Sequence, residues 1–312
     1  MVTAFLFPGQ GSQKVGMGAD LAAAFPEARA VLEAVDDALG EKLSTLMAEG
    51  PESTLMLTAN TQPALMAVSL AAIRALEAAI GRRFADLAGV AAGHSLGEYA
   101  ALTAAGTFEL ADAARLLRLR GAAMQAAVPP GEGAMAAILG LGLGECEFAA
   151  AAADGIVDVA NDNADGQVVL SGGADAVARA VELAKQAGAK RALPLAVSAP
   201  FHCRLMQPAA ERMAEALAAV TMRDPVIPIV ANVSAAPVTT AAAVREALIA
   251  QVCARVRWRE TMAELAAMNT TEVVEAGSGK VLAGLAKRSV PNATIANLET
   301  AADVRALAER LA

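Results

Sequence analysis

A short stretch around residue 95 constrains the fold more than any other part of the chain. Residues 90–93 have the pattern of a buried strand, and Gly93-His94-Ser95-Leu96-Gly97 joins that strand directly to an alanine-rich helical pattern. A serine between two glycines in this context is typical of the nucleophile elbow, a tight turn that exposes a serine hydroxyl between a strand and a helix. Glycine is favoured at both flanks because the backbone approaches itself there and a Cβ would collide. The alternative interpretation is an ordinary helix-capping serine on a glycine-bounded turn.

The overall composition narrows the class of protein. The chain has 312 residues, enough for one large domain or for a large and a small one, and its 56% of apolar residues with 3% aromatics predict an aliphatic core. The net charge of −8 and the lack of a lysine and arginine run argue against a nucleic-acid-binding protein. There is no signal-peptide pattern and the apolar stretches are interrupted, so we expect a cytoplasmic protein without a membrane segment. The scattered Cys146, Cys203 and Cys253 predict a reduced protein without a metal site.

Strand-like and helix-like segments alternate along most of the chain, which predicts an α/β fold with a mainly parallel sheet covered on both faces. We expect strands at residues 3–7, 89–92, 225–230 and 271–275, the last being the final core strand. Helices are expected at 19–38, 61–80 with Pro63 in its first turn, 96–105, 109–126, 208–220, 241–253 and 301–311. Residues 277–280 lack the spacing of a phosphate-binding loop and are interpreted as a plain strand-to-helix turn.

The pattern changes after a proline- and glycine-rich break at residues 128–133. We then expect a strand at 134–140, a helix at 143–153, strands at 156–162 and 167–172, a helix at 174–187 and a strand at 190–197. This β-α-β-β-α-β order is ferredoxin-like. The sequence thus predicts a small ferredoxin-like domain at residues 129–196, inserted in a larger core formed by 1–128 and 197–312.

One arginine occupies a position where a charge is costly. On the helix expected at 109–126, Arg120 lies in the middle of the apolar stripe, whereas Arg115 and Arg118 lie on the solvated side. A buried charge must be paired, so Arg120 predicts either a structural ion pair or an anionic substrate group bound in the bidentate geometry of a guanidinium. Gln251 also lies on the apolar face of its helix, so its amide needs a buried partner or a ligand.

A reactive serine needs a base, and the chain contains only two histidines. His94 precedes Ser95 on the same turn, where adjacent side chains diverge, so we interpret it as a structural or pocket-lining group. His202, on a loop after Pro200, is the remaining candidate for the base. Five aspartates between Ser95 and His202 fall in the expected small domain and not at a core strand end, so the sequence favours a dyad: Asp154, Asp158, Asp162, Asp165 and Asp175. We expect a backbone carbonyl or an amide to orient the histidine in place of an acid.

Several motifs taken together resemble one family. They are Phe7-Pro-Gly-Gln-Gly-Ser-Gln13, Gly93-His-Ser-Leu-Gly-Glu-Tyr99, Arg120-Gly121, Ala160-Asn-Asp-Asn163, Pro200-Phe-His-Cys203 and Gln251. In this order they resemble the malonyl-CoA:acyl-carrier-protein transacylase family over essentially the whole chain. The resemblance implies an α/β-hydrolase-like core with a ferredoxin-like insert, in agreement with the predicted elements.

The resemblance also implies roles for the residues around the elbow. Ser95 corresponds to the nucleophile that becomes malonylated, and His202 to the general base that later acts as the acid. Gln251 corresponds to the residue whose backbone carbonyl orients that histidine. The backbone N–H groups of Gln10 and Leu96 correspond to the oxyanion hole.

The substrates follow from the same resemblance. Arg120 corresponds to the arginine that pairs with the free carboxylate of malonate, and Phe201 fits a preference for malonyl over the bulkier methylmalonyl group. No cofactor is implied: the substrate is malonyl-CoA, and the accepting phosphopantetheine thiol is carried by the partner, acyl carrier protein. Residues 277–279 are Gly-Ser-Gly where the family usually has Gly-Pro-Gly, a departure that concerns the shape of a turn and not the chemistry.

The sequence leaves other functions open. A serine thioesterase or hydrolase shares the elbow, but does not need a cation opposite the nucleophile and usually has an acidic triad member. A malonyl loader for a polyketide or malonate-decarboxylase system would differ in the carrier protein that it accepts. A silent carrier-binding module is disfavoured because every reactive position holds a competent residue. Since the family's carrier protein is acidic, we expect a local basic patch, with these candidates: Arg115, Arg118, Lys185, Lys190, Arg191 and Arg204.

Overall fold

The computed structural model describes residues 2–311, and its larger sheet has six strands. These are β1 (Val2–Phe7), β2 (Val90–Gly93), β7 (Ile229–Val230), β8 (Pro237–Val238), β9 (Thr270–Ala276) and β10 (Thr294–Leu298). They lie in the order β10-β9-β1-β2-β7-β8, and every neighbouring pair is parallel except β7 with β8. The predicted mainly parallel sheet is therefore confirmed, and the strand that ends at the elbow, β2, lies inside it.

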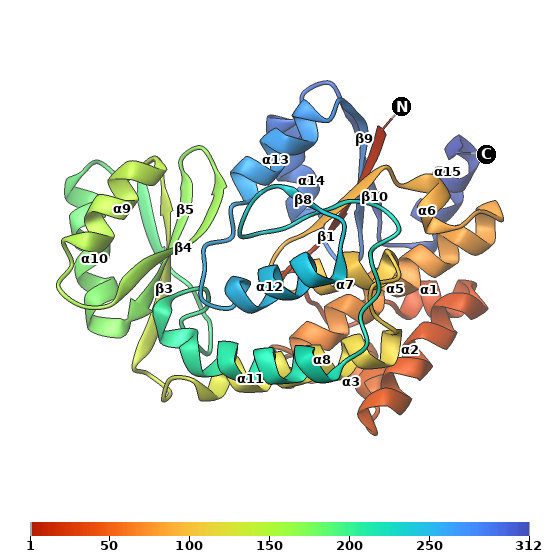
Figure 1. Cartoon of the computed structure of the whole chain (residues 1–312), viewed down its shortest axis with the longest axis horizontal. Helices are drawn as coiled ribbons and strands as arrows, with labels where there is room; N and C mark the ends of the chain where they lie inside the picture. The colour runs from red at the N-terminus through yellow and green to blue at the C-terminus, as the bar shows by residue number, and fades with distance from the viewer. Residues whose placement is uncertain (1, 312) are drawn as a thin grey trace.

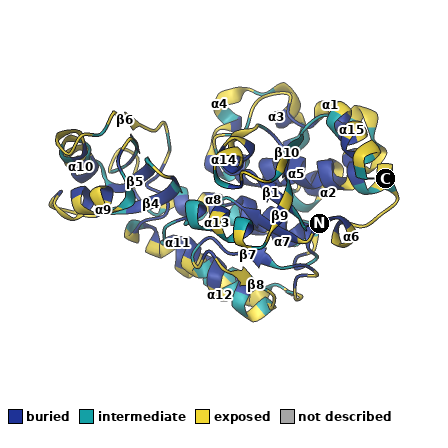
Figure 2. Cartoon of the chain, turned by 90° about the horizontal axis from the view of Figure 1, so that it is seen from above, coloured by how far each residue is buried: buried dark blue, intermediate teal, exposed yellow. Residues whose placement is uncertain are grey.

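The alternating side chains of β1 show how the sheet is covered on both faces. Phe5 and Phe7 point into the hydrophobic core on one side, Ala4 and Leu6 point into the core on the other, and all four are fully buried. Figure 2 shows these central strands buried, with exposed residues on the outward faces of the surrounding helices. Such two-sided burial is expected of a parallel sheet.

Helices pack unequally on the two faces. The first face is covered by α1 (Ala19–Ala24), α2 (Pro26–Leu39), α3 (Leu43–Glu49), α4 (Glu52–Leu55), α5 (Thr58–Ile80), α6 (Phe84–Leu87), α7 (Gly97–Ala104), α8 (Leu110–Ala126), α11 (Gln207–Ala219), α12 (Ala241–Gln251) and α15 (Ala301–Leu311). The second face is covered by α13 (Trp258–Ala267) and α14 (Val281–Ser289). The helices that carry or border the elbow, α7, α8 and α12, are all on the first face.

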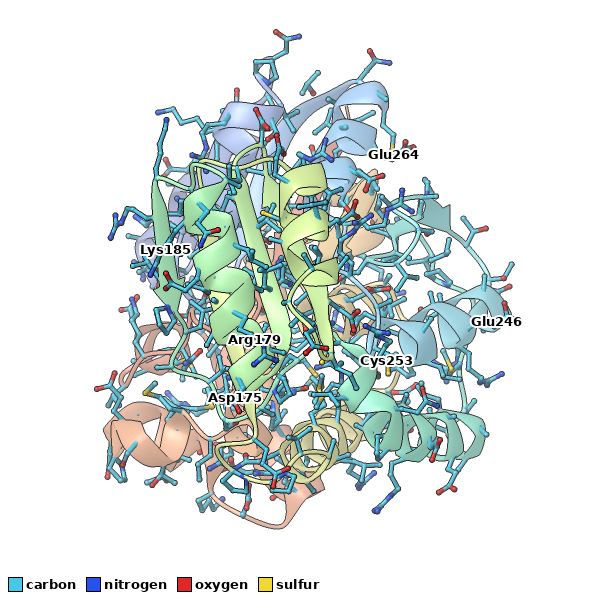
Figure 3. The ribbon with its side chains drawn as sticks, turned by 90° about the vertical axis from the view of Figure 1, so that its left-hand side faces the viewer. Asp175, Arg179, Lys185, Glu246, Cys253 and Glu264 are labelled. Carbon is cyan, nitrogen blue, oxygen red and sulfur yellow. The ribbon has the colours of Figure 1, made fainter. Side chains whose placement is uncertain are left out.

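A second sheet forms a smaller lobe, at the left of Figure 1. It contains β3 (Gly133–Leu139), β4 (Val157–Ala164), β5 (Gln167–Gly173) and β6 (Arg191–Pro194), with α9 (Leu143–Ala151) and α10 (Ala174–Gln186). The strands lie in the antiparallel order β4-β5-β3-β6, and the two helices share a separate core cluster with them. The β-α-β-β-α-β order is the expected one, while the domain limits at residues 129 and 196 stay a prediction. Figure 3 views this lobe from its outer side, with Asp175, Arg179 and Lys185 along α10.

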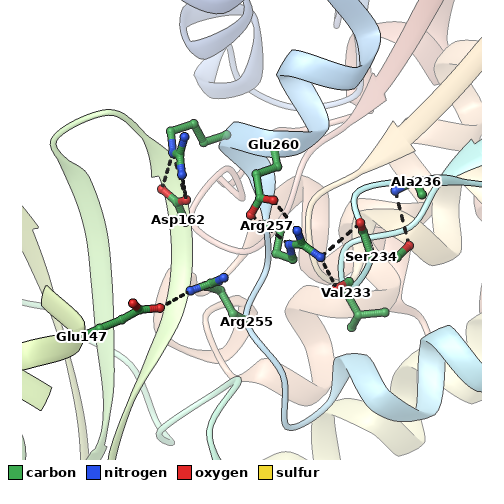
Figure 4. Close-up of polar contacts among 9 residues, drawn as sticks. Glu147, Asp162, Val233, Ser234, Ala236, Arg255, Arg257 and Glu260 are labelled. Atoms are coloured by element: carbon green, nitrogen blue, oxygen red, sulfur yellow. Dashed lines mark hydrogen bonds and ion pairs between the residues drawn. The ribbon is translucent and has the colours of Figure 1, made fainter. Parts of the chain in front are cut away.

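The lobe joins the core where β4 meets the segment before α13. The N–H of Asp162 donates to the carbonyl of Val256 at 3.0 Å. Two ion pairs cross the same junction, Asp162 with Arg259 at 2.9 Å and Glu147 with Arg255 at 2.6 Å (Figure 4). The carboxylate of Asp162 is buried, so its pairing with Arg259 is the better shielded of the two.

Two helix predictions need correction. The helix expected at 19–38 is interrupted at Phe25, whose extended backbone (φ −130°, ψ 117°) is the conformation favoured before a proline, and Pro26 then begins α2. The helix expected at 61–80 begins at Thr58, so Pro63 lies in its second turn rather than its first. Asn60 donates from its side chain to the carbonyl of Thr54, and Thr61 to that of Leu55, which fixes the early start.

Strand predictions were too long in two places and incomplete in a third. The strand expected at 190–197 is only Arg191–Pro194, and the chain leaves the sheet after one more bond, from the N–H of Leu195 to the carbonyl of Met135 at 2.9 Å. The strand expected at 225–230 is only Ile229–Val230, after Pro228. Residues 271–275 are not the final strand, because β10 follows and pairs with β9 at the sheet edge. β10 is only half-buried, so it carries little apolar signal. The helix α13 before β9 was not predicted either, whereas α14 begins at Val281, directly after the strand-to-helix turn expected at 277–280.

One helix, α5, has a longer apolar stretch than we expected from the sequence. α5 meets the length and hydropathy of a membrane span, with a mean hydropathy of 1.6 over its most apolar window. However, 72% of that window is buried inside the protein. α5 packs against α2 and α8 as a helix of the core.

Candidate active site

The turn between β2 and α7 has the geometry of a nucleophile elbow. Ser95 adopts a left-handed backbone with φ 54°, which is strained for a residue with a side chain. A Cβ on Gly93 would lie 1.9 Å from the carbonyl carbon of Gly97, and a Cβ on Gly97 would lie 2.2 Å from the carbonyl oxygen of Phe7. Both glycines are therefore required by close backbone approach, as the sequence indicated.

His202 contacts the serine from a separate loop between β6 and the short 3-10 helix η1 (Arg204–Met206). Its Nε2 lies 2.7 Å from the Oγ of Ser95, and its Nδ1 lies 2.9 Å from the main-chain carbonyl oxygen of Gln251. A carbonyl only accepts, so Nδ1 carries the proton and Nε2 is free to accept one from the serine. The oriented dyad without an acid that the sequence favoured is the arrangement observed.

The environment of His202 keeps its imidazole neutral. Burial lowers the pKa of His202 to about 3, and the positive charge of Arg120 contributes in the same direction. The hydrogen bond to Gln251 acts against this shift but is weaker. The histidine is thus unprotonated at neutral pH, as a proton acceptor must be.

Arg120 lies buried beside the same serine, with 1% of its surface exposed. Its Nη1 donates to the Oε1 of Gln62 at 2.8 Å, and its Nη2 donates to the Oε1 of Gln251 at 2.8 Å and to the Oγ of Ser95 at 3.2 Å. Its Nε is buried without any hydrogen-bond partner. Within residues 2–311 no carboxylate lies within 4 Å of the guanidinium, so the structural ion pair that the sequence left open is not formed.

The N–H groups of Gln10 and Leu96 are available near the serine. Within the described chain neither donates to a protein acceptor, and both residues line the cavity that contains Ser95. The side chain of Gln10 is fixed by a hydrogen bond from its Nε2 to the Oγ1 of Thr58 at 3.3 Å. Two unpaired donors beside a nucleophile are what an oxyanion hole requires.

These groups meet in one small cavity of about 120 Å³. It is lined by Gln10, Gln62, His94, Ser95, Leu96, Arg120, Met124, Met135, Asn161, Leu195, Val197, Phe201 and His202. Of the catalytic and substrate-binding residues predicted from the sequence, only Gln251 does not line the cavity. It contacts two residues that do, His202 and Arg120. The cavity thus combines a serine, a neutral base, a buried cation and two free N–H donors.

Comparison with known proteins agrees with this chemistry. Residues 4–304 match the acyl transferase domain family. The malonyl CoA-acyl carrier protein transacylase of Escherichia coli strain K12 is 46% identical over 299 residues, which cover 95% of each chain. The chain belongs to the malonyl CoA-acyl carrier protein transacylase family. It is accordingly an acyltransferase of the S-malonyltransferase class.

Solved structures of malonyl transacylases have the same fold. The acyl-carrier-protein S-malonyltransferase of Bartonella henselae superposes with a TM-score of 0.97 at 51% identity, covering 100% of this chain and 99% of that one. A malonyl-transacylase in complex with a type II polyketide-synthase acyl-carrier protein superposes with a TM-score of 0.95 at 43% identity, covering 99% and 100%. The similarity therefore extends over both lobes.

The second histidine of the chain, His94, has a different environment. The Nε2 of His94 lies 2.9 Å from the Oδ1 of Asn163 on β4, and its ring lies 5.2 Å from that of Trp258. Burial lowers the pKa of His94, so it stays neutral. His94 both lines the cavity and links the elbow to the small lobe, which agrees with the structural or pocket-lining interpretation.

Sequence reasoning missed three buried polar residues around the site. Gln62 binds Arg120, while Glu98 and Asn232 bind each other and the elbow. Each could have been noticed: Gln62 interrupts an apolar helix, and Glu98 is a lone carboxylate in an alanine-rich helix. Asn232 follows β7 at the carboxyl edge of a parallel sheet, where functional groups gather.

The expected basic patch is mostly neutralised. Arg115, Arg118, Lys185 and Arg204 pair with Asp112, Glu41, Glu182 and Asp158. Arg118 is also half-buried rather than fully solvated as expected, because it reaches Asn60. In residues 2–311 only Lys190 and Arg191 of the six candidates have no ion pair. The same part of the chain contains no cluster of metal-binding side chains.

Proposed function

We propose that this chain moves the malonyl group of malonyl-CoA to the phosphopantetheine thiol of acyl carrier protein through a malonyl-Ser95 intermediate. The product would supply extender units for fatty-acid synthesis. The single observation that carries the proposal is Arg120, a buried guanidinium without a carboxylate partner whose Nη2 is 3.2 Å from the Oγ of Ser95. Such a group is stabilised by an anionic end on the acyl group that the serine receives.

The first half-reaction uses the Ser95–His202 pair. As Oγ attacks the thioester carbonyl, its proton passes to Nε2 of His202, and the carbonyl oxygen becomes an oxyanion bound by the N–H groups of Gln10 and Leu96. Collapse of this intermediate breaks the C–S bond, and His202 returns the proton to the CoA sulfur. The acyl group is then held as an ester of Ser95.

The second half-reaction reverses these steps with another thiol. The phosphopantetheine thiol gives its proton to His202, and its sulfur attacks the ester carbonyl. The C–O bond to Ser95 breaks, and the proton returns to Oγ. The enzyme is regenerated without any cofactor.

Arg120 couples substrate choice to catalysis. The cation contributes to the low pKa of His202, so a substrate carboxylate that neutralises it makes the histidine a stronger base. An acetyl group lacks this carboxylate and leaves the buried cation unpaired. A malonyl group is therefore favoured both in binding and in proton transfer.

The methylene of the malonyl group, between its two carbonyl carbons, would meet apolar side chains. Phe201 is buried and lines the cavity together with Met124 and Met135. In a space of about 120 Å³ a methyl branch on the malonyl group would press against these side chains. Phe201 thus supports malonyl over methylmalonyl selection.

We assign the partner and the compartment by the same reasoning. An acidic carrier protein would dock on unneutralised cations, and among the candidate residues Lys190 and Arg191 meet this condition. Because the thioester donor is an intracellular metabolite and the thiol acceptor an intracellular protein, we place the activity in the cytoplasm.

CoA release with and without carrier protein tests the proposal. With malonyl-CoA alone, we expect the release of one equivalent of CoA per active site. Release should then stop, because the malonyl ester on Ser95 reacts further only with an acceptor thiol. Adding carrier protein should restart release. Continued release without the carrier would instead support a serine thioesterase or hydrolase. Comparing fatty-acid and polyketide carrier proteins by kcat/KM then separates a fatty-acid enzyme from a polyketide or malonate-decarboxylase loader.

A further inference from the structure

Glu98 is a buried carboxylate that the reaction described above does not use. It lies in the first turn of α7, three residues after the nucleophile, with 1% of its surface exposed. No cation lies within 4 Å of it in residues 2–311. A carboxylate without an ion pair is costly in the interior, so its hydrogen bonds must account for its position.

One oxygen of Glu98 accepts two hydrogen bonds. Its Oε2 accepts from the side-chain Nε2 of Gln251 at 2.7 Å and from the main-chain N–H of Asn232 at 3.1 Å. Both donors are fully buried. Without the carboxylate they would have no acceptor at this point.

Gln251, which Glu98 holds, also bonds to three groups of the site. Its Nε2 also donates to the carbonyl of Ser95 at 3.0 Å, and its Oε1 accepts from Arg120 at 2.8 Å. Its own carbonyl accepts from Nδ1 of His202 at 2.9 Å. Because Oε1 and Nε2 belong to one amide, Glu98 determines which end of that amide faces Arg120.

Asn232, whose main chain Glu98 holds, bonds to the elbow through its side chain. Its Oδ1 accepts from the N–H of Ser95 at 2.7 Å, and its Nδ2 donates to the carbonyl of Gly93 at 2.7 Å. These two bonds clamp the strained turn that holds Ser95 at φ 54°. Glu98 fixes the main chain of Asn232, and Asn232 fixes the elbow.

We infer that Glu98 is a positioning residue for acyl transfer, which holds Gln251 and Asn232 so that Ser95, His202 and Arg120 keep their reactive arrangement. This inference rests on the proposed function. The carboxylate of Glu98 touches neither the Oγ of Ser95 nor the ring of His202, and acts through one intermediate residue in each direction. Only the main-chain N–H of Glu98 bonds directly to Ser95, at the carbonyl oxygen and 3.0 Å.

The charge of Glu98 adds to its hydrogen bonding. Burial raises the pKa of Glu98 to about 7, while Gln251, Asn232 and the charge of Arg120 limit the rise. The charged or titratable groups that face it are Arg120 on α8 and Tyr99 beside it on α7, with His202 beyond Gln251. Burial raises the pKa of Tyr99 and burial lowers that of His202, so both stay neutral and only Glu98 titrates near pH 7.

Two substitutions separate geometry from charge. Glu98→Gln can place its amide oxygen where Oε2 lies and keep both bonds without a charge, whereas Glu98→Ala removes both bonds. We expect Glu98→Ala to lower kcat for malonyl transfer about 100-fold and to raise KM for malonyl-CoA. Glu98→Gln should recover most of this, to within about tenfold of wild type, since it loses only the charge-assisted strength of the bonds.

The pH profile gives a readout that a purely structural role would not move. Wild-type kcat/KM should fall below pH about 7 as Glu98 takes up a proton, and His202 cannot cause this fall because its pKa is about 3. Glu98→Gln should show no such fall down to pH 6. A fall that persists unchanged in Glu98→Gln, or full kcat in folded Glu98→Ala, would overturn the inference.

Glu275 provides a matched control. It is another fully buried carboxylate, and it accepts hydrogen bonds from the N–H groups of Leu282 and Ala283 at the start of α14. Glu275→Gln should leave kcat and the pH profile unchanged. If wild type itself forms no acyl-enzyme with malonyl-CoA, the proposed function fails; if it does and the Glu98 variants match it, only the positioning role fails.

Discussion

The Nη2 of Arg120 donates a hydrogen bond to the Oγ of Ser95 across 3.2 Å, so the buried cation contacts the nucleophile before any substrate is present. Ser95 also lies 2.7 Å from the Nε2 of His202. The hydroxyl is thus placed between a proton acceptor and a positive charge that stabilises its developing anion. The same cation lowers the pKa of the histidine, so full basicity depends on what neutralises Arg120.

Substitution of Arg120 should change which acyl groups are transferred. Arg120→Ala removes the partner of the malonyl carboxylate, and we expect kcat/KM for malonyl-CoA to fall at least ~100-fold. Relative activity toward acetyl-CoA should rise, because the depressed basicity of His202 is relieved. Arg120→Lys keeps a charge without the planar fork and should give an intermediate loss. Initial rates with the two thioesters check this, and an unchanged preference for malonyl would locate the clamp elsewhere.

The cavity wall at Phe201 should control branched substrates. Phe201→Ala enlarges a cavity of about 120 Å³, so methylmalonyl-CoA should gain relative to malonyl-CoA. We expect the ratio of the two kcat/KM values to shift about tenfold, the usual effect of one methyl group in an apolar pocket. Competition between the two thioesters, followed by mass analysis of the acylated protein, measures the ratio. An unaltered ratio would show that Phe201 is only a core residue.

The neutral histidine should make stability depend on pH. The pKa of His202 falls from 6.5 to about 3 on folding, so the unfolded chain binds a proton that the folded chain does not between these values. The stabilisation that results from the neutral histidine is fully present above pH 6.5 and decreases as the pH falls toward 3. At pH 5 the free energy of unfolding has decreased by about 2 kcal/mol from this cause. His202→Gln lacks this titration, so its free energy of unfolding should decrease less between pH 7.5 and pH 5. Urea unfolding of both proteins at the two pH values checks the difference, and parallel decreases would contradict the buried neutral state.

The junction of the two lobes should depend on one buried carboxylate. Asp162 is buried and pairs with Arg259, whose side chain is 42% exposed, so we expect Asp162→Asn to lower the free energy of unfolding by about 1–2 kcal/mol. Asp158→Asn is the control, because the side chain of Asp158 is 27% exposed and that of Arg204 is 66% exposed, so this pair should contribute less than about 1 kcal/mol. Thermal unfolding of both variants measures the contrast. Equal effects would mean that the burial of Asp162 does not matter.

Much of the fold was predictable because its local signals are strong. Alternating strands and helices indicated the parallel sheet, and the β-α-β-β-α-β order indicated the small lobe. The misses have local causes as well: Pro26 splits a helix, and β6 and β10 are edge strands with a weak apolar pattern. An edge strand forms because it pairs with a neighbouring strand, and the sequence of the edge strand alone does not show that pairing.

The site was predictable where a residue conflicted with its surroundings. Arg120 and Gln251 stood out because each interrupts an apolar helix face, and the two meet at 2.8 Å. Glu98 and Asn232 were missed because their importance comes from a contact between residues 134 positions apart, at 3.1 Å. The sequence also could not decide between an ion pair and a substrate for Arg120, since that depends on which carboxylates the fold brings near.

Intact-protein mass spectrometry after brief exposure to malonyl-CoA, with peptide mapping, tests the proposed chemistry most directly. Wild type should gain one malonyl group, located on Ser95, and acetyl-CoA should give little adduct under the same conditions. Ser95→Ala should gain none while keeping its thermal stability, because alanine retains the Cβ at that turn. A malonyl adduct that survives in Ser95→Ala, or a wild type that acetyl-CoA labels as readily, would contradict a serine nucleophile selected for dicarboxylic acyl groups by Arg120.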